Sequence, residues 1–474
     1  MDQTIMSEVI RREELKTLEI SIDQVCTLFF YGDRVIRGVN KEYIEQVKDM
    51  MSGGMLDELI TKKLFVKTWI SDLKIEGFDL VIEHENIEFW NYPYEWSFSM
   101  LQDAANTVLD CNEVANKYGY ELFDVHAFNV VFNMAQPVYL DFGSFIKVDA
   151  KNDKAWTGFN NFYNSFYMPL YLYNKGFSDL SNSIYLHYGL FSDRDLFLLR
   201  NKHVTILGKK ITSWIFKIHN SKRRLAAARY VRVIEKYGKH KHIDKLLKFK
   251  KLFQNKYSVS YAKRLLKRVS TSHIDSYWKD YHNNKNPSQD NRFLRITEII
   301  NKDLSDATSL IELASNQGKF ADYVRENTQM NQIIATDYDK NALDQIYLNN
   351  RFSDKVLPLL YDFVRPNNRT NTNKIEDRIN ADVVMALAVT HHLILTQDIT
   401  VDHIFNVLES LATKYVIIEF MPLGLYSGDM DNIPEVPEYY TLEWFKTNFS
   451  DRFDYILDEE LDINRHVFVG KIKN

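Results

Sequence analysis

Polar and small residues follow an apolar segment in the C-terminal part of this chain. The segment SLIELASNQGKFADYV passes from a strand pattern into a turn and then a helix, and Glu312 ends the strand with a carboxylate. Asn316 tolerates the unusual backbone angles of such a turn, and Gly318 allows a ligand to lie close to the main chain. Open α/β sheets bind ligands at the carboxyl ends of their strands. The turn is therefore predicted to hold a nucleoside.

The next two strand patterns also end in carboxylates. Asp337 closes NQIIATD, where it would accept hydrogen bonds from two ribose hydroxyls. The alternative is that Asp337 caps the helix beginning near Lys340, a role for which Asp339 is better placed. We expect Asp337 to bind the ligand and Asp339 to cap the helix. Asp362, at the end of KVLPLLYDF, is either a ligand of the adenine amino group or a turn residue.

Two histidines and a glutamate follow later strands at the same edge. His391 and His392 come after the buried run ADVVMALAVT, and Glu419 ends VIIEF. An imidazole titrates near neutral pH and can take a proton from a hydroxyl, so either histidine is a candidate general base. The alternative is a pair of hydrogen-bonded core histidines. Glu419 is a second candidate base or a substrate ligand.

An alternation of strands and helices positions these residues and predicts an α/β fold. The predicted strands are 308–314, 331–336, 354–360, 381–387, 414–420, 452–458 and 465–471. The predicted helices are 318–328, 340–348, 402–412 and 441–448. No helix separates the last two strands, which predicts an antiparallel pair at one edge of the sheet. This feature distinguishes methyltransferase sheets from those of dinucleotide dehydrogenases.

The first turn resembles the first motif of class I S-adenosylmethionine-dependent methyltransferases, with Ala314 in place of the glycine that usually follows the strand. The series ELASNQGKF, ATDYD, LPLLYDF, DRINADVVMALAVTHHL and VIIEFMP resembles a family of methyltransferase-like bacterial proteins related to a host-specific nodulation protein. The resemblance implies a Rossmann-like methyltransferase domain over residues 276–474. The residues that it implies for binding S-adenosylmethionine are Glu312, Ala314, Asn316, Gly318, Asp337 and Asp362.

The same resemblance implies a substrate class. The expected reaction is O-methylation of a sugar or surface glycoconjugate, and hence a role in polysaccharide biosynthesis. Before the fourth strand the family has a Pro- and Gly-rich stretch with an arginine. This chain keeps the arginine as Arg378 but lacks the glycine, so the role of this loop toward the substrate is left open.

Residues 1–199 are predicted to form a separate α+β domain. Apolar and β-branched runs predict a small sheet within 20–95, and helical spacing predicts a helix over 96–118. Aromatic residues in 155–200, as in GFNNFYNSFYMPLYLYNKGF, indicate a helical core packed with rings.

Two short loops of this domain, FDVHAFNVVF and YLDFGSF, resemble the catalytic and metal loops of kinase-like phosphotransferases that act on small molecules. The resemblance implies that Asp124 takes the acceptor's proton, while Asn129 and Asp141 hold Mg²⁺ for ATP. No Gly-rich loop precedes a strand lysine, and Lys67 in LFVKTW is a poor match for that lysine. A degenerate scaffold and a working phosphotransferase therefore both remain open.

Residues 200–275 are predicted to form a helical connector with a cationic face. Residues 200–268 contain 22 Lys or Arg and two acidic residues, a net charge of about +20, so the rest of the chain carries about −25 of the total of −5. Such a segment can pair with acidic surfaces of its own chain, an anionic membrane or glycolipid, or nucleic acid. Internal pairing or solvation is the favoured interpretation, followed by an anionic membrane surface. Nucleic acid comes third, because no recognised binding module accompanies the charge.

Composition argues against several other classes of protein. The two cysteines cannot form a disulfide framework or a zinc cluster. The N-terminus has charges where a signal peptide needs an apolar block, and no run reaches the roughly 20 apolar residues of a membrane span. We expect a cytoplasmic protein, peripheral at the inner membrane face if the basic segment binds lipid. Two other functions stay open, a non-catalytic scaffold with degenerate folds and an RNA methyltransferase.

Overall fold

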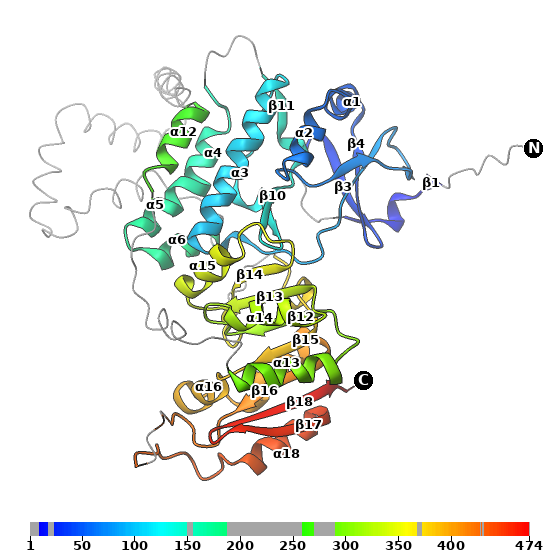
Figure 1. Cartoon of the computed structure of the whole chain (residues 1–474). Coiled ribbons are helices and arrows are strands. Elements are labelled where there is room, and N and C mark those ends of the chain that lie inside the picture. The colour runs from blue at the N-terminus through cyan, green and yellow to red at the C-terminus, as the bar shows by residue number, and fades with distance from the viewer. Residues whose placement is uncertain are drawn as a thin grey trace, which may run out of the picture.

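The computed structural model has two parts that pack directly against each other (Figure 1). An N-terminal part of small sheets and helices precedes a C-terminal part built on one large sheet. The structure describes residues 9–17, 23–148, 155–186, 258–269, 290–366, 372–426, 428 and 431–473. Most of the predicted basic connector lies outside these residues, so expectations for it can be compared with the structure over 258–269 alone.

Seven strands form the C-terminal sheet, in the order β14-β13-β12-β15-β16-β18-β17. Strands from β14 to β16 run parallel, whereas β18, the last strand of the chain, runs antiparallel to both of its neighbours. The strands are β12 (Ser309–Leu313), β13 (Gln332–Asp337), β14 (Val356–Leu360), β15 (Ala381–Ala386), β16 (Ala412–Phe420), β17 (Phe453–Asp462) and β18 (Arg465–Ile472). The predicted α/β fold with an antiparallel edge pair is therefore confirmed.

Each of these strands begins close to its predicted start. For the parallel strands the reason is that strands buried on both faces appear in a sequence as unbroken apolar runs. Val383, Val384, Met385 and Ala386 of β15 are completely buried in this way. The helices are α13 (Asn291–Asp303), α14 (Lys319–Asn327), α15 (Lys340–Asn349), α16 (Thr390–Gln397), α17 (Val401–Leu411) and α18 (Leu442–Arg452). Four of them match predicted helices, whereas α13 and α16 were not expected.

The N-terminal part contains a five-stranded antiparallel sheet in the order β2-β3-β4-β7-β5, as the small sheet predicted within residues 20–95 requires. Its strands are β2 (Lys16–Thr17), β3 (Cys26–Tyr31), β4 (Arg34–Val39), β5 (Thr68–Ile70) and β7 (Val81–His84). Helices α1 (Ile44–Ser52) and α2 (Met55–Thr61) lie between β4 and β5 in the chain. A short parallel pair joins β1 (Val9–Ile10) to β6 (Lys74–Ile75).

A long helix, α3 (Phe98–Lys117), confirms the prediction for residues 96–118. Ser97 caps it, because its side chain accepts a hydrogen bond from the backbone N–H of Met100. Two antiparallel pairs follow, β8 (Tyr120–Leu122) with β11 (Phe145–Lys147) and β9 (Val130–Asn133) with β10 (Gln136–Tyr139). Helices α4 (Phe159–Phe162), α5 (Met168–Asn174) and α6 (Ser178–Leu186) complete the part, with a π-helical stretch at Tyr163–Tyr167.

Rings fill the space between these helices, as the aromatic composition predicts. Phe162 and Phe166 stack with centroids 5.5 Å apart, and Phe98 meets Tyr173 at 5.2 Å. Helix α12 (Val259–Leu266) packs against α3, and Lys263 forms ion pairs with Asp110 at 3.0 Å and Glu113 at 2.7 Å. This lysine thus agrees with internal pairing of the basic segment.

One continuous hydrophobic core joins the two parts. Helix α15 lies along α3, where the ring of Tyr347 meets Phe132 edge-on at 5.7 Å and its hydroxyl donates to Asp103 at 2.6 Å. Arg351 also bonds to Asp103, at 2.7 Å from its Nε. The β14 side of the large sheet therefore faces the N-terminal part, and β17 and β18 lie at the far end (Figure 1).

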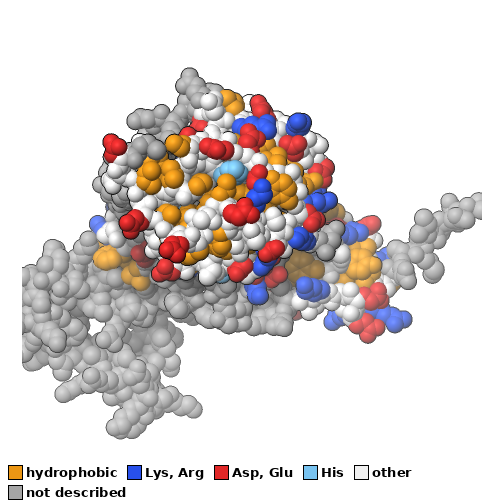
Figure 2. Space-filling view, turned by 90° about the horizontal axis from the view of Figure 1, so that it is seen from below, with side chains coloured by type: hydrophobic (Ala, Val, Ile, Leu, Met, Phe, Trp, Pro, Cys, Tyr) orange, Lys and Arg blue, Asp and Glu red, His pale blue; other side chains and the backbone are white. Residues whose placement is uncertain are grey.

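Acidic, basic and apolar side chains are interspersed over the face seen from below in Figure 2, the side of the C-terminal part remote from the N-terminal part. Among the described residues, no helix has both the length and the apolar character needed to cross a membrane.

Candidate functional site

The turn after β12 folds through three left-handed residues. Ala314, Asn316 and Gly318 have φ values of +54°, +52° and +71°. A side chain at such angles is strained, so Ala314 occupies a backbone position that favours glycine. A Cβ added to Gly318 would lie 3.0 Å from the side chain of Ile346 on α15. Gly318 therefore makes room for helix packing, and its contact with a ligand stays a prediction.

Asp337 lies against this turn. Its Oδ2 accepts a hydrogen bond from the backbone N–H of Asn316 at 2.7 Å, and its Oδ1 accepts from that of Asp339 at 2.8 Å. Burial raises the pKa of Asp337 to about 7, against these two hydrogen bonds, which lower it. Asp339 caps α15 by accepting from the N–H groups of Asn341 and Ala342. The ends of β12 and β13 therefore lie side by side, as predicted, and Asp339 caps α15.

A cleft of about 290 Å³ opens beside Asp337. Its lining includes Ala314, Asn316, Asp337, Tyr338, Tyr361, Asp362, Leu387, Ala388 and His392. Asp362 also forms a local turn, because its Oδ1 accepts from the N–H groups of Val364 at 3.3 Å and Arg365 at 3.1 Å. The two interpretations offered for Asp362 are therefore compatible, since the turn holds a carboxylate at the wall of the cleft.

A second, smaller cavity of about 40 Å³ shares Ala314, Leu387 and Ala388 with the larger cleft, so the two adjoin. Glu312 and Arg292 line it. The Oε2 atom of Glu312 is buried and has no hydrogen-bond partner among the described residues. Burial raises the pKa of Glu312 to about 8, although the nearby Arg292 guanidinium lowers it. An incoming cation would satisfy this carboxylate.

Glu419 lies behind these cavities and is completely buried. Its Oε2 accepts from Arg292 at 3.2 Å, from Arg465 at 3.1 Å and from the backbone N–H of Ala388 at 2.8 Å. The other oxygen, Oε1, is buried and has no hydrogen-bond partner among the described residues. Glu419 lines neither cavity, and its role as a base or substrate ligand stays a prediction. It positions both arginines and the Ala388 turn.

The two histidines take different places at the start of α16. His392 lines the larger cleft, whereas His391 is buried, and their ring centroids lie 4.1 Å apart. Burial lowers the pKa of both, and that of His391 falls to about 3 with help from His392 and Arg465. Both rings are therefore neutral at pH 7. Of the pair, His392 is the one placed to meet a substrate.

Sequence patterns did not identify Arg292, Arg465 or the Leu387–Ala388 turn. Arg292 lies on the unexpected helix α13, whose buried Phe293, Ile296, Ile299 and Ile300 follow helical spacing that could have revealed it. Arg465 begins β18, and only the closing of the sheet brings it to Glu419 on β16. No local signal marks it.

The loops of the N-terminal part bring Asp124, Asn129 and Asp141 together. The side-chain amide of Asn129 donates to the backbone oxygen of Asp124 at 2.8 Å and to Oδ2 of Asp141 at 3.3 Å. The side chain of Asp124 is 39% exposed, and its Oδ1 accepts from Asn161 at 3.1 Å. The two loops thus bring the three residues close together, as the resemblance to phosphotransferase loops implies. Their catalytic roles stay predictions.

Lys67 takes no part in this cluster. Its side chain is 66% exposed and pairs with Glu85 at 3.4 Å, and its role as the nucleotide-binding lysine stays a prediction. A buried cation lies instead on β4, where Arg37 pairs with Asp23 at 2.6 Å. A Cβ placed on Gly143 would collide with Asp23, so this ion pair packs tightly against the loop that begins at Asp141.

No family model matches the chain. The Nodulation protein NoeA of Rhizobium meliloti (strain 1021) is 26% identical over 358 residues, which cover 72% of this chain and 71% of that protein. A S-adenosylmethionine-dependent methyltransferase from Clostridium acetobutylicum has a TM-score of 0.31 and 11% identity, with 42% of this chain and 96% of that one covered. The N-methyltransferase NodS from Bradyrhizobium japonicum has a TM-score of 0.27 and 12% identity, with 39% and 99% covered. At such low TM-scores, the fold assignment rests on the strand order.

Proposed function

We propose that the C-terminal part is an S-adenosylmethionine-dependent methyltransferase. One observation carries the proposal. In a sheet with an antiparallel last strand, two adjoining cavities lie at the carboxyl ends of the parallel strands, with Asp337 beside the turn after β12. Ligands of open α/β sheets bind at that edge.

The residues at the cavities suit the separate groups of this cofactor. Asp337 would hold the ribose hydroxyls and Asp362 the adenine amino group, since both line the larger cleft. The orphaned Oε2 of Glu312 would accept from the ammonium group, and Arg292 would face the carboxylate. When bound, S-adenosylmethionine supplies an electrophilic methyl group on a sulfonium centre. The protein mainly has to align the acceptor and exclude water.

We infer that the acceptor is a hydroxyl of a sugar or surface glycoconjugate, with the protein acting in polysaccharide biosynthesis. The resemblance to the nodulation-protein family leads to this acceptor class. The neutral ring of His392 at the cleft supports the chemistry, because a neutral imidazole can accept the proton that a hydroxyl loses on methylation.

Titration calorimetry with S-adenosylmethionine tests the cofactor. Measurable heat that Asp337→Ala abolishes is expected. A scaffold that has lost its cofactor predicts no heat with either protein, and that result would remove the methyltransferase proposal. Incubation of the purified chain with methyl-labelled cofactor and a bacterial extract then tests the acceptor. Label in a carbohydrate fraction is expected, and label confined to RNA would establish the RNA alternative instead.

On the face shown in Figure 2, the described basic side chains are interspersed with acidic ones, whereas phosphate backbones reward clustered cations. Most of the basic segment that would hold RNA lies outside the described residues. Binding to RNA that weakens steeply as salt rises would favour the RNA alternative. Attachment of the basic segment to an anionic membrane is a further proposal, which flotation with anionic and neutral vesicles tests.

We propose a phosphotransferase activity for the N-terminal part. The proposal rests on the contact between Asn129 and Asp141, the residues that would hold Mg²⁺ for ATP in a kinase-like site. The buried pair of Arg37 and Asp23 lies beside the same loop and would supply the cation on the neighbouring sheet. A rise in melting temperature with ATP and Mg²⁺, lost in Asp141→Asn, is expected. No shift at millimolar ATP would indicate a degenerate scaffold.

A further inference from the structure

The N-terminal part of the chain packs behind one wall of the nucleoside cleft. A small cavity of about 20 Å³ is lined by Tyr94 and Glu95 on one side and by Tyr361 and Asp362 on the other. Tyr361 and Asp362 also line the larger cleft, so they separate the two spaces. Residues of the N-terminal part therefore lie directly behind the carboxylate proposed to meet adenine.

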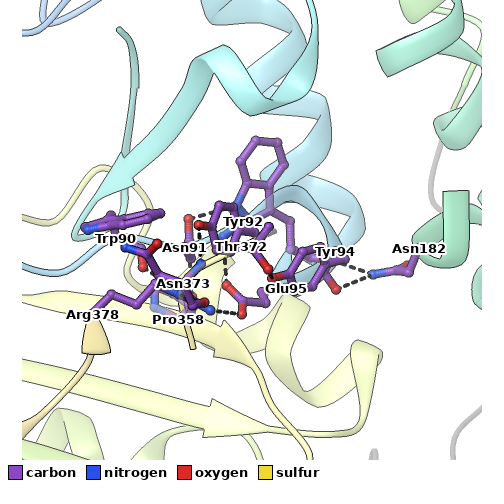
Figure 3. A network of polar contacts seen from close by, with 11 residues as sticks. Trp90, Asn91, Tyr92, Tyr94, Glu95, Asn182, Pro358, Thr372, Asn373 and Arg378 are labelled. Atoms are coloured by element: carbon purple, nitrogen blue, oxygen red, sulfur yellow. Dashed lines mark hydrogen bonds and ion pairs between the residues drawn. The ribbon is translucent and has the colours of Figure 1, made fainter. Parts of the chain in front are cut away.

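Arg378 joins this wall to the connection between β14 and β15. Its side chain is 2% exposed and forms an ion pair with Oε1 of Glu95. Its Nη1 donates to the backbone oxygen of Trp90 at 2.8 Å, and its guanidinium lies 4.5 Å from the ring centroid of Tyr92. Figure 3 shows these residues gathered beside β14 at the junction. Arg378 thus points to the N-terminal segment and lines none of the three cavities described here.

The contacts around Arg378 fix the same connection from several sides. The hydroxyl of Tyr92 accepts from the backbone N–H of Asn373 at 3.1 Å, and the hydroxyl of Tyr94 lies 3.3 Å from that of Thr372. The other oxygen of Glu95 accepts from the N–H of Tyr92 at 2.7 Å, which holds the carboxylate in place. Both carboxylate oxygens of Glu95 are therefore used.

Asp362, by contrast, bonds within its own turn, to the N–H groups of Val364 and Arg365. Hydrogen bonds from the N–H of Tyr361 to the oxygen of Asp337 at 3.0 Å, and between His403 and the oxygen of Val364 at 2.9 Å, join the turn to β13 and α17. Its remaining support comes from what packs behind it, namely Ile375 and the Tyr94–Glu95 segment that line the small cavity with Tyr361. Ile375 belongs to the short helical turn that leads to Arg378, and the backbone N–H of Arg378 donates to its oxygen at 3.1 Å.

We propose that Arg378, held by Glu95 and by the rings of Trp90 and Tyr92, is a positioning residue that sets Asp362 for recognition of the adenine amino group. The N-terminal part is then a component of the cofactor site. This inference rests on the proposed function, because it concerns the same cleft. A buried guanidinium paired on all sides holds its neighbours in one geometry, and loss of one partner leaves an uncompensated charge.

The test compares two ligands that differ only on the edge of the purine ring that carries the amino group. S-adenosylhomocysteine has the amino group and an unprotonated N1, whereas S-inosylhomocysteine has a carbonyl oxygen, which repels a carboxylate, and a hydrogen on N1. Calorimetry on the full chain gives the ratio of the two dissociation constants. The unaltered protein should prefer S-adenosylhomocysteine by at least about tenfold, the equivalent of one well-placed hydrogen bond.

Arg378→Met should lower that ratio at least about threefold, because Asp362 moves. Arg378→Lys should retain more of the preference than Arg378→Met. The milder Glu95→Gln replaces it if Arg378→Met does not fold, and the same fall is expected. Arg351→Met is the matched control, since it also removes an arginine that pairs across the junction, with Asp103, but lines none of the three cavities. It should lower stability and leave the ratio unchanged.

An unchanged ratio in both Arg378→Met and Glu95→Gln, or an equal fall in Arg351→Met, would overturn the proposal. Equal affinity of the unaltered protein for both ligands would also overturn it while leaving the methyltransferase proposal standing. Binding of neither ligand would remove the methyltransferase proposal itself.

Discussion

At the scale of single residues, two buried carboxylates lie at the adjoining cavities, Glu312 at the smaller one and Asp337 at the larger cleft. Glu312 and Asp337 end neighbouring parallel strands, and burial raises the pKa of both toward or above neutrality. Burial of a carboxylate is unfavourable unless a partner compensates it, and buried polar groups with perturbed pKa values are concentrated at functional sites. A ligand bearing hydroxyl and ammonium donors would compensate both.

Replacement of Asp337 by asparagine tests the ribose contact. Asp337→Asn keeps the size of the side chain but loses the negative charge that ribose hydroxyls would bind, so affinity for S-adenosylmethionine should fall at least about tenfold. Titration calorimetry measures this. Asp339→Asn is the matched control, because asparagine also caps helices well and should leave the affinity unchanged. Equal affinities in all three proteins would contradict the assignment.

The same two carboxylates predict how stability changes with pH. Their folded-state pKa values of about 8 and about 7 lie above the ordinary 4.5 and 3.8, so between these limits the folded protein binds protons that the unfolded chain releases. The stability of the ligand-free protein should therefore fall as pH rises from 5 to 8, by at most about 1.4 kcal/mol per pH unit for each group. Melting temperatures across this range measure the slope.

A double variant, Glu312→Gln with Asp337→Asn, provides the comparison for that slope. Its melting temperature should vary less with pH, because neither side chain can titrate. If the two slopes are the same, other groups cause the pH dependence.

At the scale of elements, the turn between β12 and α14 carries strain that the sequence reveals at one position. Ala314 has a left-handed backbone, which costs an L-residue about 1 kcal/mol relative to glycine. Ala314→Gly should therefore raise the free energy of unfolding by up to about 1 kcal/mol, as measured by urea denaturation. Ala321→Gly, within α14, should lower it by about 1 kcal/mol or more. A loss of stability in Ala314→Gly would show that the methyl group of Ala314 contributes packing.

Prediction of elements from the sequence succeeded where burial leaves a simple pattern. The parallel strands are unbroken apolar runs, and Asp337 was located because it ends one of them. The sequence failed at α16, because THHLIL continues the apolar run of β15 and hides the turn at Ala388. Because the helix was not predicted, the sequence also could not tell which histidine faces the cleft. The helix directs the ring of His392 to the cleft and buries that of His391.

At the scale of the whole molecule, ion pairs and rings hold the two parts together at the β14 side of the sheet. Asp103 on α3 bonds to both Tyr347 and Arg351 of the other part, and Asp344 accepts from Ser99. These contacts join residues 244 to 248 positions apart. No local pattern in the sequence encodes them, so the prediction of separate domains gave no sign of the junction.

Removal of Asp103 should destabilise both parts at once. Asp103→Ala leaves the buried Tyr347 hydroxyl without its acceptor, whereas Arg351 is 45% exposed and can be solvated, so we expect a loss of about 2 kcal/mol in calorimetry with a single unfolding transition. Asp110→Ala on the same helix is the control, because Asp110 is 50% exposed and should cost less than about 1 kcal/mol. Two separated transitions in the unaltered protein would contradict the cooperative junction.

The shared core along α3 and α15 also constrains how the gene can vary. We expect a substitution on one side of the contact, such as at Asp103, to be tolerated when Arg351 and Tyr347 change with it. Neither half is then an exchangeable module, and a chimera assembled from two relatives must take both faces of the contact from one parent.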